Sequence, residues 1–300
     1  MKKEQRQGLI FGSLAADSLS LGSHWVYNTT AIEKRLGRPS ELADPIVKTF
    51  HPKRKRGEFT HYGDQAFWLL EFLAETDGYD NQLFFELWKL KMSEYDGYLD
   101  HASKETMKNG KASGSDDLGG AGRTAPLACL YHDDPEALVN AAVRQAQLTH
   151  GSPLVQDVAR FFSLLLFKAD KPMDQAITSV FSAGKWNSDM LKEGVEKGIT
   201  STDRETTKTI KEFGQMCGSE KALPSVIHLL VTYPDNYREA MIANTAAGGD
   251  SAARGLLAGM ILGSRLGFPA IPEEWVEPLV QKKRIETALE RIGQLRTELV

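Results

Sequence analysis

Small residues recur at every fourth position in two segments, and this spacing constrains the fold more than any other feature of the chain. The two series are Gly255, Gly259, Gly263 and Gly267 near the C-terminus, and Gly8, Gly12, Ala16 and Ser20 near the N-terminus. Positions four apart lie on one face of a helix, so each series leaves a ridge without side chains. Each glycine costs a helix about 1 kcal/mol relative to alanine, and close packing against another backbone would offset that cost. We therefore predict two helices in the centre of the fold, close to each other.

Apolar residues elsewhere in the chain also recur with the period of a helix. Predicted helix faces are marked by Ala66, Leu69, Leu70 and Leu73, by Leu83, Leu87 and Leu90, by Leu138, Ala142 and Ala146, and by Val155, Val158, Phe162 and Leu165. The segment 276–299 has the pattern of a charged amphipathic helix. Hairpin signals are missing, and no long linker or repeat divides the chain. The prediction is one compact all-α domain, a multi-helix bundle over residues 1–300.

Charge and cysteine content exclude several classes of protein. The formal net charge is -4 and the pI is about 6.0, which argues against a nucleic-acid partner. The basic run at residues 51–56 contains Pro52 and precedes Gly57, so we expect a solvated loop there. Cys129 and Cys217 lie far apart within apolar helical patterns, which predicts small core residues in a reducing compartment.

Membrane and secretion signals are weak in this sequence. The most apolar stretch, residues 255–267, is bracketed by Arg254 and Arg265 and is too short to span a bilayer. The apolar stretch near the N-terminus contains Asp17, which argues against a signal peptide. We therefore predict a cytoplasmic protein without a membrane partner. Its oligomeric state stays open.

Several aspartates lie beside glycines at predicted helix starts. They are Asp64, Asp116, Asp117 and Asp250, while a further aspartate, Asp17, lies inside an apolar helix that His24 follows. Each one alone is explained by capping of a helix N-terminus. Together they indicate a ligand site, because helix N-termini attract phosphates and clustered carboxylates suit Mg²⁺. This combination predicts a small, nucleotide-like ligand.

Histidines and other reactive side chains give weaker signals. His150 follows Thr149 at the end of a predicted helix, where it is either a capping residue or a ligand contact. No HExxH spacing, phosphate-binding loop or serine nucleophile motif is present. Trp25 and Tyr27 either stack on a base or fill the core, and the sequence leaves both interpretations open.

Three motifs together resemble the ADP-ribosylglycohydrolase superfamily. They are Gly8-Leu-Ile-Phe-Gly-Ser-Leu-Ala-Ala-Asp17, Thr149-His150 and Gly248-Gly-Asp-Ser-Ala-Ala-Arg-Gly255, and the match covers about residues 8–269. His24-Trp-Val-Tyr27, Tyr62-Gly-Asp-Gln65 and Gly114-Ser-Asp-Asp117 resemble more specifically its branch of J1 crystallins and selenoprotein-J-like proteins.

The resemblance implies an all-α orthogonal bundle with a crevice for ADP-ribose. Hydrolases of this superfamily use two Mg²⁺ ions to cleave the bond between the ribose and an acceptor side chain, through an oxocarbenium-like transition state. By this resemblance the candidate catalytic residues are Asp64, Asp116, Asp117 and Asp250, and Asp64 and Asp250 are candidate metal ligands. The candidate ligand-binding residues are Asp17, His24, Gly119, Gly120, His150, Gly248, Gly249 and Ser251.

The metal motifs depart from the family pattern. The hydrolases carry Thr-Asp-Asp-Thr where this chain has residues 62–65, which retain only Asp64. A gapless alignment from Gly57 retains neither aspartate. In the second motif, Gly-Asp-Thr-Asp-Thr, Asp250 is kept while Ala252 and Ala253 replace two ligands. Because alanine cannot coordinate a metal, we expect fewer Mg²⁺ ions than in the dinuclear members.

Two functions from different classes fit this sequence. The first is an enzyme that hydrolyses a glycosidic bond of an ADP-ribosyl or related nucleotide-sugar substrate with a degenerate metal site. The alternative is a non-catalytic binding or structural protein, J1-crystallin-like, that has kept the fold. The lost metal ligands favour the second, and the retained aspartates at glycine-rich helix starts favour the first.

Overall fold

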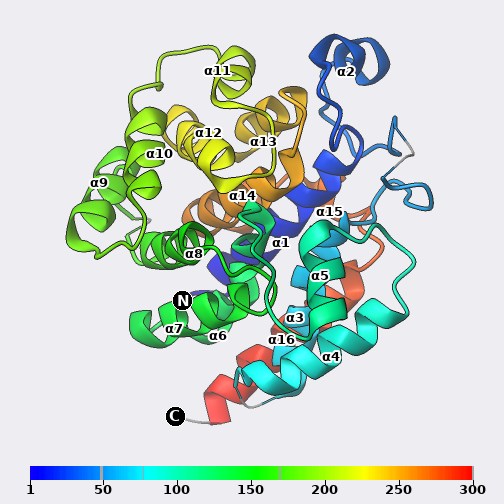
Figure 1. The fold of residues 1–300 in the computed structure, drawn as a ribbon, viewed down its shortest axis with the longest axis vertical. Helices are drawn as coiled ribbons and strands as arrows, with labels where there is room; N and C mark the ends of the chain where they lie inside the picture. The colour runs from blue at the N-terminus through cyan, green and yellow to red at the C-terminus, as the bar shows by residue number, and fades with distance from the viewer. Residues whose placement is uncertain (48–49, 77, 169, 299–300) are drawn as a thin grey trace.

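A computed structural model describes residues 1–47, 50–76, 78–168 and 170–298, and its regular structure is helical (Figure 1). The α-helices are α1 (Lys3–Leu21), α2 (Thr29–Leu36), α3 (His61–Glu75), α4 (Asn81–Ser93), α5 (His101–Asn109), α6 (Ala125–Leu130), α7 (Pro135–Ala146), α8 (Pro153–Leu166), α9 (Met173–Ala183), α10 (Asp189–Ile199), α11 (Thr206–Phe213), α12 (Ser219–Thr232), α13 (Tyr237–Ala246), α14 (Ser251–Leu266), α15 (Glu273–Val276) and α16 (Lys282–Glu298). Three short 3₁₀ helices are η1 (Leu118–Gly120), η2 (Gly122–Thr124) and η3 (Phe268–Ala270).

The described part of the chain forms no β-sheet, and its β-type pairing is limited to two isolated bridges, Ser113–His150 and Asp117–Gly218. The all-α prediction is confirmed, while the boundary of one domain over 1–300 stays a prediction.

Helices α1 and α14 form the centre of the molecule and pack along their lengths (Figure 1). A Cβ atom on Gly259 would lie 2.2 Å from the carbonyl oxygen of Gly12, and one on Gly263 would lie 2.1 Å from that of Gly8. These distances leave no room for any side chain, so the glycine spacing allows backbone-to-backbone contact. The predicted central helix pair is confirmed.

The remaining helices surround this pair in two groups (Figure 1). Helices α12 and α13 contact α14 on one side, and α10 packs on α12. On the other side α3 contacts α1 and α14 and is covered by α4 and α16. The N-termini of α3 and α14 and the short helix η1 supply the residues of the candidate site described below.

Two predictions about helix faces and ends were wrong. Leu83 and Leu90 are each 58% exposed and point to solvent, and only Leu87 of the predicted leucine face packs against the core. The buried face of α4 is instead formed by Phe84, Trp88 and Met92, which have the same helical spacing and larger side chains. The helix predicted over 276–299 is α16, which begins at Lys282; Val276 is instead the last residue of the short helix α15, and the last two residues lie outside the described part of the chain. Within the described ranges no helix has the length and hydropathy of a membrane span.

Candidate functional site

Asp250 lies at the N-terminus of α14 and is fully buried. Its carboxylate accepts hydrogen bonds from the backbone N–H of Ala253 (3.3 Å), from His24 Nε2 (2.9 Å) and from the hydroxyl of Tyr62 (3.2 Å). The first is the helix cap that the sequence predicts. The other two bring side chains from distant parts of the chain to the same carboxylate.

Asp117 lies opposite Asp250 and shares the Tyr62 hydroxyl with it. The distance from this hydroxyl to Asp117 Oδ2 is 2.9 Å, and Asp117 also caps η1 by accepting from the N–H of Gly119 (2.8 Å). Gly119 has to be a glycine here, because a Cβ atom would lie 2.1 Å from the Tyr62 ring. The structure therefore joins two predicted carboxylates through a tyrosine.

Burial and mutual repulsion give the two carboxyl groups different acidities. Burial raises the pKa of Asp117 well above its usual range, and the charge of Asp250 raises it further. Burial alone would raise the pKa of Asp250 as well. The hydrogen bond and charge of His24, together with the charge of Arg254, bring the pKa of Asp250 below its ordinary value.

Cys217 is the third member of this cluster. One oxygen of Asp117, one oxygen of Asp250 and the sulfur of Cys217 all lie within 4.8 Å of one another. Burial and the two carboxylates raise the pKa of the Cys217 thiol. The prediction of two core cysteines holds for Cys129, which is buried, but Cys217 is half-buried and lies at the site.

Three histidines surround the carboxylates. His24 Nδ1 is 2.8 Å from His51 Nε2, so His51, His24 and Asp250 form a continuous chain. His61 is fully buried, and neither of its ring nitrogens has a hydrogen-bond partner. Burial is the main cause that lowers the pKa of His51 to about 2 and that of His61 to about 4, so both rings are neutral at pH 7.

Aromatic side chains cover the outer side of the histidines. The Trp25 ring lies edge-on to Phe50 and Tyr98, with both centroid distances at 4.8 Å. Among the described residues other than glycine, only Trp25 has a positive φ, 59°. This backbone conformation destabilises the folded state by about 1–3 kcal/mol, and residues that adopt it cluster at functional sites such as ligand-binding sites. The N–H of Trp25 donates to the carbonyl of Gly249 (2.8 Å), which ties this strained residue to the N-terminus of α14.

A buried arginine closes the inner side of the site. Arg123 donates from Nη1 to Gln65 Oε1 (2.7 Å) and from Nη2 to the hydroxyl of Thr149. That hydroxyl is 2.8 Å from His150 Nδ1, while His150 Nε2 is buried without a partner. Burial and the charge of Arg123 lower the pKa of His150 to about 3. A Cβ atom on Gly120 would lie 2.6 Å from the His150 ring, so this glycine makes room for the imidazole.

The structure places the other predicted residues outside this cluster. Asp64 bonds to Arg54 Nη2 (2.7 Å) and to the hydroxyl of Tyr95 (2.6 Å). Tyr62 and Asp64 are two positions apart on α3 and so point to opposite sides of the helix, because each residue turns by about 100°. Asp116 is exposed.

Asp17 supports the N-terminus of α3 from α1 and has no contact with the carboxylate pair. It accepts from the N–H (2.8 Å) and the hydroxyl (2.6 Å) of Thr60. Burial is the main cause that raises its pKa to about 7. Its environment is that of a structural cap between two helices.

The glycine amides at the start of α14 are occupied within the protein. The N–H groups of Gly248, Gly249 and Ser251 donate to the carbonyls of Thr245, Val26 and Gly249, respectively. Gly248 and Gly249 have φ of 65° and 61°, which is why glycine is needed at both. Their amides are therefore not free to bind a phosphate in this conformation.

Sequence reasoning missed four residues of the site: His51, His61, Arg123 and Cys217. His51 was assigned to a solvated loop, yet it is 2% exposed, and Arg54 from the same loop pairs with Asp64. The prediction of a solvated basic loop was wrong for these two residues. A usable signal was the short Gly214–Gly218 segment, which places Cys217 between two glycines beside polar residues.

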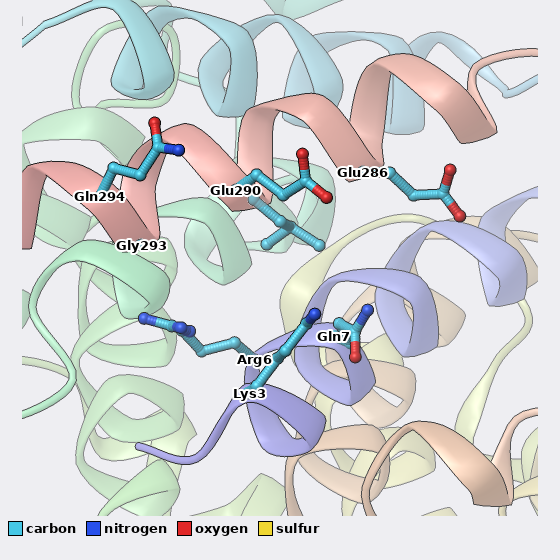
Figure 2. Close-up of a pocket in the computed structure, with 8 residues that line it drawn as sticks. Lys3, Arg6, Gln7, Glu286, Glu290, Gly293 and Gln294 are labelled. Carbon is cyan, nitrogen blue, oxygen red and sulfur yellow. The ribbon is translucent and has the colours of Figure 1, made fainter.

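A separate groove of about 650 Å³ lies between α1 and α16 (Figure 2). Lys3, Arg6 and Gln7 from α1 face Glu286 and Glu290 from α16 across it. None of its lining residues belongs to the candidate site. In the carboxylate cluster Asp250 is buried, and Asp117 and Cys217 are partly exposed.

Comparisons with known proteins agree with this description. The family model described as ADP-ribosylglycohydrolase matches residues 2–299. An uncharacterized protein of Archaeoglobus fulgidus is 24% identical over 259 residues, which cover 81% of this chain and 83% of that protein. Crystallin J1A of Tripedalia cystophora is 19% identical, over 98% of this chain and 97% of the crystallin. A solved structure described as an ADP-ribosylglycohydrolase-related protein complex has the same fold, with a TM-score of 0.77 at 20% identity and 98% coverage of both chains.

Proposed function

Because the chain belongs to the ADP-ribosylglycohydrolase family, we propose that it binds an ADP-ribosyl or related nucleotide-sugar ligand and hydrolyses its glycosidic bond at Asp117 and Asp250. The observation that carries this proposal is the pair of carboxylates joined by the Tyr62 hydroxyl, at 2.9 and 3.2 Å. Side chains from three elements meet at this point, which capping alone does not require.

The chemistry of the pair suits the cleavage of a glycosidic bond. Positive charge develops on the sugar as the bond breaks, and an adjacent carboxylate stabilises that charge. His24 holds the Asp250 carboxylate in a fixed orientation, so this group is preorganised for that role. A carboxylate also accepts the proton of the attacking water.

The nucleotide part of the ligand would lie against the aromatic side chains outside the histidines. Trp25, Phe50 and Tyr98 form a half-buried surface, and Tyr27, two residues after Trp25 in the chain, is 48% exposed. Aromatic rings stack on nucleobases by about 1–3 kcal/mol per base. His150 and Arg123 are assigned to the inner part of the ligand, because His150 Nε2 is buried without a partner.

The two magnesium ions that the family resemblance implies do not fit these residues. Ala252 and Ala253 offer no ligand atoms, and Asp64 is bonded to Arg54 and Tyr95. At most one ion fits at the carboxylate cluster, so the proposal contains fewer ions than a dinuclear site and no step that depends on magnesium. Asp64 and Asp116 have no role in the proposed chemistry.

A non-catalytic role is the second candidate. It is supported by the similarity to crystallin J1A and crystallin J1B of Tripedalia cystophora, which extends over 98% and 94% of this chain. It is also supported by the occupied amides at the start of α14, which leave few free donors for a phosphate.

Calorimetric titration with ADP-ribose separates the two candidates when it is combined with an assay for ADP-ribose release. The assay uses peptides that carry ADP-ribose on arginine or on serine. Binding together with release from either peptide is the expected result. Neither binding nor release, with and without added divalent cations, would overturn the enzymatic proposal in favour of the non-catalytic one.

A further inference from the structure

The cluster of Asp117, Cys217 and Asp250 has the composition of a metal site that differs from the one the family resemblance implies. Its two oxygens and one sulfur lie within 4.8 Å of one another, so a single ion placed between them would be within about 2.8 Å of all three, and a small movement of the side chains would give ligand distances of about 2.0–2.3 Å. A magnesium site is built from oxygen ligands alone. The sulfur is therefore the feature that a magnesium site does not explain.

The backbone holds the three ligands at this point from both sides. The N–H of Leu118, next to Asp117, donates to the carbonyl of Cys217 (2.9 Å), and the N–H of Asp250 donates to the carbonyl of Gln215 (2.8 Å). The segment that carries Cys217 is thus fixed between the two aspartates. Such an arrangement is preorganised, which a metal site requires.

An independent observation indicates that the space beside the cluster is built for a ligand. His61 is completely buried and neither ring nitrogen has a hydrogen-bond partner, while Nε2 lies 3.7 Å from Asp100 Oδ2. Its ring lies on the ring of Tyr62, at a centroid distance of 3.8 Å, and the Tyr62 hydroxyl contacts both carboxylates. Buried polar groups are almost always hydrogen-bonded, so an imidazole whose Nδ1 has no hydrogen-bond partner at this position points to a bound group that completes it.

We propose that Asp117, Cys217 and Asp250 bind one divalent cation of borderline softness, such as Zn²⁺, in preference to Mg²⁺. Thiolate ligands select zinc-like ions, whereas carboxylates alone suit magnesium. Binding replaces the thiol proton by the metal and releases that proton to solvent. His24, which bonds to Asp250, acts as a positioning residue for this ligand. The inference rests on the proposed function only in sharing its two carboxylates.

The test is a titration of metal-free protein with Co²⁺, which serves as a spectroscopic probe for Zn²⁺. We expect one equivalent to bind with a thiolate-to-cobalt charge-transfer band in the near ultraviolet. Zn²⁺ should abolish the band at one equivalent, and a large excess of Mg²⁺ should leave it unchanged. The substitution Cys217→Ser should remove the band, and His24→Gln should weaken Co²⁺ binding by about 10–100-fold.

The second free cysteine provides a matched control. Cys129 is buried in α6, so Cys129→Ala should keep the band at full intensity. Asp64→Asn is a further control that leaves both cysteines in place, and circular dichroism checks that each variant is folded. Co²⁺ binding without the band, a band that survives Cys217→Ser, or displacement by Mg²⁺ would each overturn the proposal. No nucleotide is used, so such a failure is distinct from failure of the ADP-ribose titration in the presence of a chelator.

Discussion

The N-termini of α3 and α14 carry the same sequence pattern, a glycine directly followed by an aspartate, and they have different surroundings. Asp250 precedes α14, caps it, and turns its second oxygen towards Tyr62. Asp64 is the fourth residue of α3, which Thr60 caps instead, and it pairs with Arg54. A shift of a few residues relative to the helix start thus places one carboxylate in the cluster and the other on a different face.

The glycines of the two patterns are needed for different reasons. Gly249 has a φ of 61°, which favours glycine. Gly63 lies within α3, and a Cβ atom there would be 2.3 Å from Asp17 Oδ2. Hence one glycine serves a backbone turn and the other serves the close approach of a carboxylate from α1. The same Gly-Asp dipeptide therefore does not imply the same structural role at the two helix starts.

The largest expected contrast between the two helix starts is in catalysis. Asp250→Asn keeps the shape of the side chain but removes the charge, and we expect hydrolysis to fall by about 10²–10⁴-fold. Asp64→Asn should leave kcat/KM close to that of the wild type, because Asp64 has no contact with the carboxylate pair. Kinetics on an ADP-ribosylated peptide measure both. Equal losses in the two variants would contradict the distinction.

The next contrast concerns the cap that α3 receives from Asp17. The pKa of Asp17 is about 7 in the folded protein, above the ordinary 3.8, so the folded state binds this proton more tightly than the unfolded state. The resulting stability is complete below about pH 4 and is lost as the pH rises through 7. Asp17→Asn does not titrate, so its stability relative to the wild type should rise by about 4 kcal/mol between pH 4 and pH 8.

Urea unfolding of Asp17→Asn and wild type across this pH range measures that difference. His51, His61 and His150, whose pKa values are lowered, are common to both proteins. Their contribution, which is lost as the pH falls below 6.5, therefore cancels in the comparison. A difference that stays constant with pH would show that Asp17 is ionised throughout the range.

A smaller effect is expected from the counter-ion of Asp64. Arg54→Met keeps much of the apolar length of the side chain but leaves the Asp64 carboxylate without its ion pair, at a cost of about 3 kcal/mol. Burial already raises the pKa of Asp64 to about 6, so the variant should lose less at pH 5, where this group is protonated, than at pH 8. Thermal unfolding at the two pH values tests this. The double variant with Asp64→Asn should recover part of the lost stability, and its stability should no longer change between the two pH values, because Asn does not titrate.

The smallest expected effect concerns Gly63, the glycine that the Asp17 carboxylate approaches. Gly63→Ala should cost about 1–3 kcal/mol by overpacking, because the new methyl group meets Asp17 and Phe59. In an Asp17→Ala background much of this cost should disappear. Gly114→Ala is the matched control, since a Cβ atom there meets no atom within 4 Å. Chemical denaturation of the wild type, Gly63→Ala, Asp17→Ala and the double variant gives the coupling free energy between the two positions. The absence of coupling would show that the strain does not arise between Gly63 and Asp17.

Much of the fold could be predicted from local patterns. The spacing of Gly8, Gly12, Gly259 and Gly263 predicted a central helix pair, because only a side-chain-free ridge permits such contact. The leucine spacing in α4 gave a wrong buried face because Phe84, Trp88 and Met92 have the same helical spacing and form the face that is buried. Periodicity identifies a helix but does not decide which of two apolar faces is buried.

Less of the candidate site could be predicted. Asp117 and Asp250 were identified from their positions near glycines, and His24 from its place after the helix that contains Asp17; the structure brings the three together. His51 was missed because nothing in its local sequence distinguishes a site residue from a loop residue, and for Cys217 the glycines at 214 and 218 were the one local signal.

The amino-acid sequence by itself determined the helices, the glycine ridge and the loss of two metal ligands at Ala252 and Ala253. Each of these depends on side chains close together in the chain or on the identity of one residue. The tertiary structure alone decided which aspartates meet, that Cys217 joins them, and that the amides of Gly248 and Gly249 are occupied. These outcomes depend on how α3, α14 and the loop before α12 are oriented around the central helix pair. That orientation is set by long-range packing, which no single stretch of sequence contains.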